Sequence, residues 1–126
     1  MKNVCLFAVM ALALYGADVT GKWTGTVDVQ DPGNGDKIST RVRAELTQAG
    51  AIVTGKIGRL QDEQLETIRD GKLTGNALVF EVMPEEATSA IKFRLTVMSD
   101  DRIEGEMSGA IDVGKISGKV VLTRTK

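Results

Sequence analysis

Hydrophobic and polar residues alternate along most of the chain, with the period of two that is typical of half-buried β-strands. In residues 19–29, one face carries valine, glycine and the only tryptophan, Trp23, while the other carries lysine, threonine and aspartate. In residues 91–97, isoleucine, phenylalanine, leucine and valine alternate with lysine, arginine and threonine. We therefore expect strands that bury one face and expose the other to water.

Turn-forming residues recur about every ten positions, which divides the chain into short strands of similar length. The alternation predicts strands over residues 19–29, 37–47, 52–57, 65–73, 77–83, 91–97, 102–108 and 116–124. Residues 61–69 have a helix-forming composition, but this short segment has no caps and no apolar stripe, and it is therefore only a weak helix candidate. Because no other segment could supply a crossover helix, the strands should be antiparallel.

Glycine recurs after an apolar residue and a small or acidic residue, and several of these glycines fall at inward positions, whereas Gly75 is also explained by a hairpin end. The glycines that follow this pattern are Gly21, Gly55, Gly75, Gly105 and Gly118. Glycine inside a strand is tolerated where the strand bends sharply or another backbone approaches closely, and a small closed barrel requires such bends. The sequence therefore predicts an all-β fold, an antiparallel up-and-down barrel of about eight strands, with a two-sheet β-sandwich as the alternative.

The inward positions of the predicted strands define a core of aliphatic residues, methionine and aromatic residues. This predicted core comprises Trp23, Val27, Ile38, Val42, Leu46, Ile57, Leu78, Phe80, Val82, Ile91, Phe93, Leu95, Val97, Ile103, Met107, Ile116, Val120 and Leu122. Val79, Met83 and Met98 fall on the outward face, where they interrupt an otherwise polar exterior. Exposed apolar residues that lie together are typical of a contact surface.

Residues 1–17 differ from the rest of the chain, because a positive start and an uninterrupted apolar run lead to the small residues Gly16 and Ala17. This order is typical of a secretory signal peptide, and the run is too short to anchor the protein across a bilayer. We expect residues 1–17 to be removed, with cleavage after Ala13 as the alternative. A single domain, residues 18–126, should then be exported to the periplasm or the extracellular space.

The predicted mature chain has neither cysteine nor histidine, because the only cysteine, Cys5, lies in the leader. It therefore holds no disulfide, and its stability has to come from its core. It carries 15 basic and 17 acidic residues, since Lys2 is the one charged residue of the leader. Charges of both signs are spread along the chain, so we expect neither nucleic-acid binding nor stable insertion into a membrane.

The spacing Gly-x4-Gly-Lys occurs three times in the chain, but its context does not favour a nucleotide site. A phosphate-binding loop requires serine or threonine as the next residue, followed by a helix. Here the next residues are Trp23, Ile57 and Ile116, each of which lies in a predicted strand. The repeated spacing follows from the abundance of glycine.

Few residues of the chain are suited to metal binding or catalysis. Without histidine or cysteine in the mature chain, we expect no zinc or transition-metal site. Asp31, Asn34 and Asp36 could supply oxygen ligands to calcium, but an acidic glycine-rich loop is more typical of a hairpin turn. The usual catalytic triad requires histidine, and carboxylates such as Glu45 and Glu81 fall on solvated faces. We therefore expect no cofactor and no enzymatic activity.

Trp23, Phe80 and Phe93 are the aromatic residues of the mature chain, and all three lie on apolar faces. This placement is typical of core residues. The alternative is that they line an internal pocket, because a barrel of eight strands can be filled by side chains or can hold one small ligand. The sequence leaves both interpretations open.

Gly21-Lys22-Trp23 resembles the Gly-x-Trp motif at the first strand of the lipocalin-type barrels. In that family an arginine at the end of the last strand covers the tryptophan ring, and Arg124 is the matching residue in this chain. Lipocalins are longer and usually carry a C-terminal helix, which this chain does not have. The resemblance implies a barrel in which Arg124 lies against Trp23.

A closer resemblance, over nearly the whole mature chain, is to small exported bacterial β-domains of uncharacterised function. The motifs that carry this resemblance are Trp23-Thr24-Gly25-Thr26, Asp70-Gly71-Lys72-Leu73-Thr74-Gly75, Val79-Phe80-Glu81-Val82, Ile103-Glu104-Gly105 and Leu122-Thr123-Arg124. The resemblance implies a lipocalin-like barrel and export, and it supplies no catalytic residue.

These observations favour an exported, non-catalytic barrel that binds a small apolar ligand in its interior. The residues expected to line the core or a pocket are Trp23, Phe80, Phe93 and Arg124. The alternative is a structural or protein-interaction module with a side-chain-filled barrel, whose partner would be another exported protein. A glycan-acting enzyme, which would need two carboxylates at catalytic separation, is the least favoured interpretation.

Overall fold

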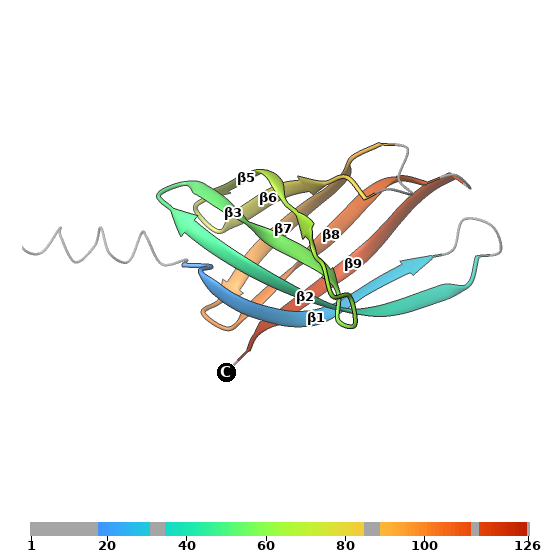
Figure 1. Cartoon of the computed structure of the whole chain (residues 1–126), viewed down its shortest axis with the longest axis horizontal. Coiled ribbons are helices and arrows are strands. Elements are labelled where there is room, and N and C mark those ends of the chain that lie inside the picture. The colour runs from blue at the N-terminus through green and yellow to red at the C-terminus, as the bar shows by residue number, and fades with distance from the viewer. Residues whose placement is uncertain (1–17, 31–34, 85–88, 112–113, 126) are drawn as a thin grey trace, which may run out of the picture.

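The computed structural model describes residues 18–30, 35–84, 89–111 and 114–125, and within these ranges it contains strands and no helix (Figure 1). The nine strands are β1 (Gly21–Gln30), β2 (Lys37–Ala49), β3 (Ile52–Arg59), β4 (Glu66–Thr67), β5 (Arg69–Thr74), β6 (Ala77–Val82), β7 (Ile91–Ser99), β8 (Arg102–Ile111) and β9 (Gly114–Arg124). None of the described residues belongs to a helix long and apolar enough to cross a membrane.

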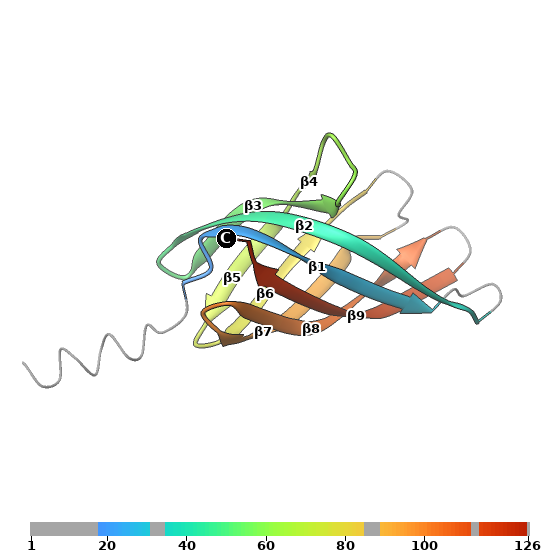
Figure 2. The same cartoon turned by 90° about the horizontal axis from the view of Figure 1, so that it is seen from below.

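The strands form a closed barrel in the order β2–β1–β9–β8–β7–β6–β5–β3 (Figures 1 and 2). Pairing of β2 with β3, from Val42 opposite Arg59 to Ala49 opposite Ile52, closes the ring. All of these pairs are antiparallel, and β4 is a two-residue extra strand on β3. The predicted up-and-down barrel of eight strands is therefore confirmed, and the two-sheet sandwich is not the fold.

β4 and β5 follow one path along β3 that is interrupted by a β-bulge at Asp70. Around this residue β5 advances three positions while β6, opposite, advances two. Asp70 has a backbone φ of 56°, in the left-handed region that aspartate tolerates better than most residues. The extra residue allows both Ile68 and Gly71 to be buried although they are three positions apart. The single strand predicted over residues 65–73 is split in two at Ile68, one residue before the start of β5.

Two inward glycines lie where neighbouring backbones pass too close for any side chain. A Cβ atom on Gly25 would lie 1.7 Å from the carbonyl oxygen of Val121. A Cβ atom on Gly105 would lie 2.2 Å from the carbonyl oxygen of Arg94. Glycine at these positions permits the tight curvature that closes a small barrel, and of the two only Gly105 belongs to the pattern on which the sequence prediction is based.

The interior of the barrel holds one continuous apolar core. Sixteen of the eighteen predicted core residues are buried, and the structure adds Val19, Ala44, Val53, Ile68 and Leu73. Val79, Met83 and Met98 are exposed, as their outward positions predict.

The prediction of the core is wrong at Ile38 and Ile116, which are not fully buried. Ile38 is 49% exposed, and Ile116 is only partly buried against the core. Both side chains lie on the inward face, so their direction follows the alternation. Ile38 lies beyond Val42, where the pairing of β2 with β3 stops, and Ile116 lies opposite Gly109, which has no side chain to cover it.

Candidate functional site

The two ends of the barrel differ in what covers them. The start of β1 and the end of β9 meet at one end, which we call the sealed end (Figure 2). At the opposite end, which we call the open end, lie the last residues of β1, β6 and β8, the first residues of β2, β7 and β9, and the β3–β4 connection. Trp23 and Arg124 belong to the sealed end, where they are paired across β1 and β9.

Trp23 lies at the centre of the sealed end and is 1% exposed. Its indole Nε1 donates a hydrogen bond to the carbonyl oxygen of Val19 at 2.9 Å, so the buried donor is satisfied. Val19 is itself fully buried, and its N–H donates to Oε1 of Gln48 at 3.0 Å. The short segment before β1 is thereby held against the indole and closes this end of the barrel.

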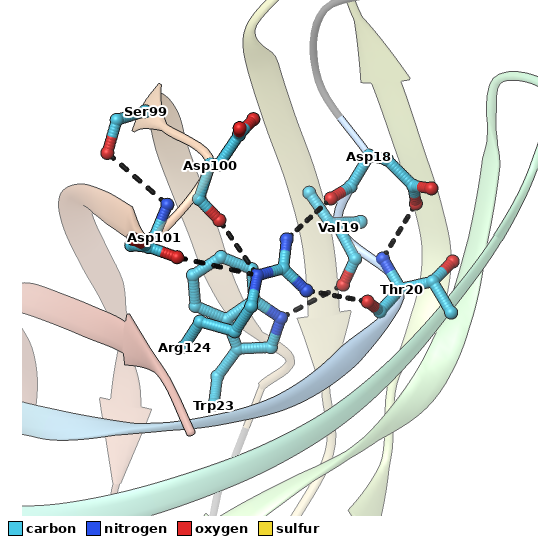
Figure 3. Close-up of polar contacts among 8 residues, drawn as sticks. All are labelled: Asp18, Val19, Thr20, Trp23, Ser99, Asp100, Asp101 and Arg124. Atoms are coloured by element: carbon cyan, nitrogen blue, oxygen red, sulfur yellow. Dashed lines mark hydrogen bonds and ion pairs between the residues drawn. The ribbon is translucent and has the colours of Figure 1, made fainter. Parts of the chain in front are cut away.

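Arg124 covers the Trp23 ring, with its guanidinium carbon 4.4 Å from the ring centroid (Figure 3). Its Nη1 and Nη2 donate to the carbonyl oxygens of Thr20 and Asp18, both at 2.7 Å. Its Nε donates to the carbonyl oxygen of Asp100 at 2.8 Å. The contact implied by the lipocalin resemblance is present. It ties the segment before β1 to the last strand and to the β7–β8 turn.

Phe80 and Phe93 face each other on β6 and β7, with ring centroids 4.7 Å apart and an interplanar angle of 17°. Both are buried, as is Met107 opposite Phe93 on β8. The next residue of this cross-strand row, on β9, is Gly118, which has no side chain. At this level the interior is therefore filled mainly from the β6–β8 side.

Among the residues that the structure describes, the inner face of the open end is apolar and only partly covered. Val29 on β1 is paired with Ile38 on β2 and with Gly118 on β9. Val29 and Ile116 are partly buried against the core, and Ile38 is half exposed. The sequence gives the inward direction of Ile38 and Ile116, but no signal in it marks the end of the barrel at which they lie. These residues form an apolar surface at the open end of the described barrel.

The β3–β4 connection at the open end is held by Asp62. The backbone N–H of Arg59 donates to Oδ2 of Asp62 at 3.1 Å, and its guanidinium is paired with Oδ1 at 3.1 Å. Arg43 Nη2 donates to the Asp62 carbonyl oxygen at 2.6 Å. The hydrogen bond from the Arg59 side chain lowers the pKa of the Asp62 carboxyl, and this effect outweighs the opposing effect of desolvation.

The residues considered as metal ligands can be checked only in the part of the chain that the structure describes. It contains no group of three or more histidine, cysteine, aspartate or glutamate residues that could hold a metal ion. Of the residues considered for calcium, Asp31 and Asn34 lie outside the described residues, as does the predicted leader, residues 1–17. Asp36 is described and forms an interaction of its own.

Comparison with known proteins does not place the chain in a family. No family model matches it, and no curated protein matches it either. The observed class is a closed eight-stranded antiparallel barrel, and membership of the lipocalin-like or exported bacterial domains stays a prediction. Function is therefore inferred from the geometry of the two ends.

Proposed function

We propose that this protein is an exported, non-catalytic β-barrel that binds a small apolar ligand at its open end. The observation that carries this proposal is Ile38, which lies on the inner face of the barrel mouth and is nevertheless 49% exposed. Val29 and Ile116 continue this apolar surface inward to the core. Covering the exposed half of an isoleucine side chain is worth roughly 1 kcal/mol, so the surface favours a ligand that displaces water from it.

The sealed end limits the size of such a ligand. Trp23, Leu78, Ile103 and Leu122 are among the most completely buried side chains, so protein atoms already occupy that part of the interior. A ligand that enters past Ile38 is confined to the outer part of the barrel. This favours a short aliphatic or small cyclic compound over a long extended chain.

The outer face is suited to an aqueous compartment. Opposite charges alternate around the barrel in one cross-strand row, formed by Asp28, Lys119, Glu106 and Arg94. Strands that face lipid instead carry an apolar outer band. Together with the signal-like residues 1–17, this row supports export to the periplasm or the extracellular space.

Matched substitutions on the two faces of the sheet test the proposal. Ile38 on β2 and Ile52 on β3 are similarly exposed, at 49% and 54%, but only Ile38 lies on the inner face of the mouth. We expect Ile38→Asp to weaken the binding of an apolar fluorescent dye at least about tenfold and Ile52→Asp to leave it unchanged. Fluorescence titration measures both affinities. Equal effects of the two substitutions, or no binding of the dye to the unaltered protein, would contradict the proposal.

A second candidate function is a structural or protein-interaction module whose barrel is filled by side chains. The buried, stacked rings of Phe80 and Phe93 favour it, because they occupy interior space that a ligand would need. Native mass spectrometry of the protein purified from its own host distinguishes the two functions. A retained small molecule supports the ligand-binding barrel, whereas a retained protein without a small molecule supports the interaction module.

A further inference from the structure

Strand β2 continues beyond its neighbour β3 at the open end (Figure 1). The paired residues of β2 and β3 end at Val42, and one further hydrogen bond runs from the N–H of Leu60 to the Arg41 carbonyl oxygen at 2.9 Å. On its other side β2 is paired with β1 as far as Lys37. Among the residues that the structure describes, residues 37–40 are therefore paired with a strand on one side only.

The register shows which backbone groups of β2 point to this open side. Within a strand, the N–H and C=O of one residue point to the same side, and successive residues alternate. The Arg41 carbonyl points toward β3, so the backbone groups of Ser39 and Lys37 point the same way, past the end of β3. Those of Ile38 and Thr40 point toward β1. Ser39 and Lys37 thus present two donors and two acceptors along an open strand edge.

A groove lies beside this edge, and its outward face carries two basic residues of β2, with Asp28 of β1 opposite Ser39 between them. The groove has a volume of about 520 Å³ and is lined by Ser39, Thr40, Arg41, Arg59, Leu60 and Gln61. Lys37 and Arg41 are exposed and flank Ser39 on the outward face. Arg59, in contrast, is already paired with Asp62. The positive charge that is available at the edge therefore comes from Lys37 and Arg41.

We propose that the β2 edge binds an extended acidic peptide segment of another protein, which adds a strand beside residues 37–40. Main-chain hydrogen bonds hold a strand added in this way, and its alternate side chains give the specificity. Outward side chains of the added strand would lie near Lys37 and Arg41, which favours aspartate or glutamate. Inward side chains would lie near Ile38 and Thr40, which favours apolar residues.

The charge of the edge favours this peptide over a second copy of the chain. Antiparallel pairing of two β2 edges about Ser39 would set Lys37 of one copy opposite Arg41 of the other, twice over. Like charges directly opposite each other destabilise a strand pair. The peptide site borders the ligand surface at Ile38, but its main-chain contacts come from Lys37 and Ser39, whose side chains lie on the outer face and do not belong to that surface.

Titration of the ¹⁵N-labelled full chain with a nine-residue peptide of alternating glutamate and valine tests the proposal. We expect the amide protons of Lys37 and Ser39 to become protected from exchange with solvent, while those of Ile38 and Thr40 change little. A peptide with lysine in place of glutamate should bind at least about tenfold more weakly. No binding of the glutamate peptide, or equal binding of the lysine peptide, would overturn the proposal.

Substitutions of Ser39 separate backbone pairing from side-chain effects. Proline removes the N–H of residue 39, which points away from β1, so the β1–β2 ladder is kept. We expect Ser39→Pro to bind the glutamate peptide at least about tenfold more weakly, and Ser39→Ala to bind it like the unaltered protein. Equal affinity of the two variants would overturn the proposal, as would a stable dimer in sedimentation without peptide.

Thermal unfolding establishes that Ser39→Pro is folded. If it is not, the double substitution Lys37→Glu and Arg41→Glu decides the same question. This variant should prefer the lysine peptide over the glutamate peptide, reversing the order seen with the unaltered protein. An unchanged preference for the glutamate peptide would overturn the role of these charges.

Discussion

Strand β9 is fully buried on its inner face near the sealed end of the barrel and only partly buried near the open end. On β9, Leu122 and Val120 are 0% and 1% exposed near the sealed end, whereas Ile116 on the same face is only partly buried near the open end. These residues are of similar type, so the difference lies in what covers them. At the sealed end, Arg124 and the segment before β1 close over Trp23. Residues at the sealed end should therefore contribute more to the free energy of unfolding than residues at the open end. The apolar surface of the open end stays available for a ligand.

Of the substitutions that test the difference between the two ends, Trp23→Ala should have the largest effect on stability. Removing a fully buried indole leaves a cavity and deprives Arg124 of the ring that it covers, so we expect a loss of roughly 3 to 5 kcal/mol in the free energy of unfolding. Urea denaturation followed by circular dichroism measures it. Met98→Ala, at an exposed position, is the control and should change stability by less than about 0.5 kcal/mol. An unaltered denaturation midpoint for Trp23→Ala would refute the central role of the sealed end.

A matched pair on β9 compares the two ends directly. Leu122→Ala should cost about 2 to 5 kcal/mol, because the side chain is completely buried. Ile116→Ala should cost less than about 1 kcal/mol, because water already reaches part of that side chain. Both values come from the same denaturation experiment. Similar losses for the two variants would show that the ends are equally packed and would remove the distinction.

The smallest expected effect is a pH dependence of the melting temperature that comes from Asp62 at the open end. The pKa of Asp62 is lowered from 3.8 in the folded protein, so its ion pair with Arg59 adds stability above that pH. This contribution is lost as the pH falls through the lowered pKa. The difference in melting temperature between the unaltered protein and Asp62→Asn should therefore narrow below pH 3.8. Calorimetry across this range measures it, and a difference that is independent of pH would contradict the assignment.

Alternation predicts the strands and their buried faces because it repeats locally along each strand. It fails at Asp70, where one extra residue in the backbone changes which positions point inward. It also fails at Ile38, although the direction of that side chain is right. Whether Ile38 is covered depends on where β3 ends, which is a property of another strand. The open strand edge could not be predicted from the sequence for the same reason.

The sealed end shows the other limit of prediction from the sequence. Arg124 and Thr20 are separated by 104 positions, and no local pattern brings them together. Only the resemblance of Gly21-Lys22-Trp23 to a known motif suggests the contact of Arg124 with the ring. Arg124 binds carbonyl groups in the segment before β1 and in the β7–β8 turn. The alternation of apolar and polar residues does not predict the backbone conformation of either segment.

The position of β9 has a consequence for the order in which the molecule is made. β9 lies between β1 and β8, so both of these strands keep an unpaired edge until β9 has been synthesised. Asp18 and Thr20, whose carbonyl groups Arg124 binds, are synthesised more than 100 residues before Arg124 itself. Closure of the barrel must therefore follow the synthesis of β9, and a chain in which β9 has not yet been made stays unclosed.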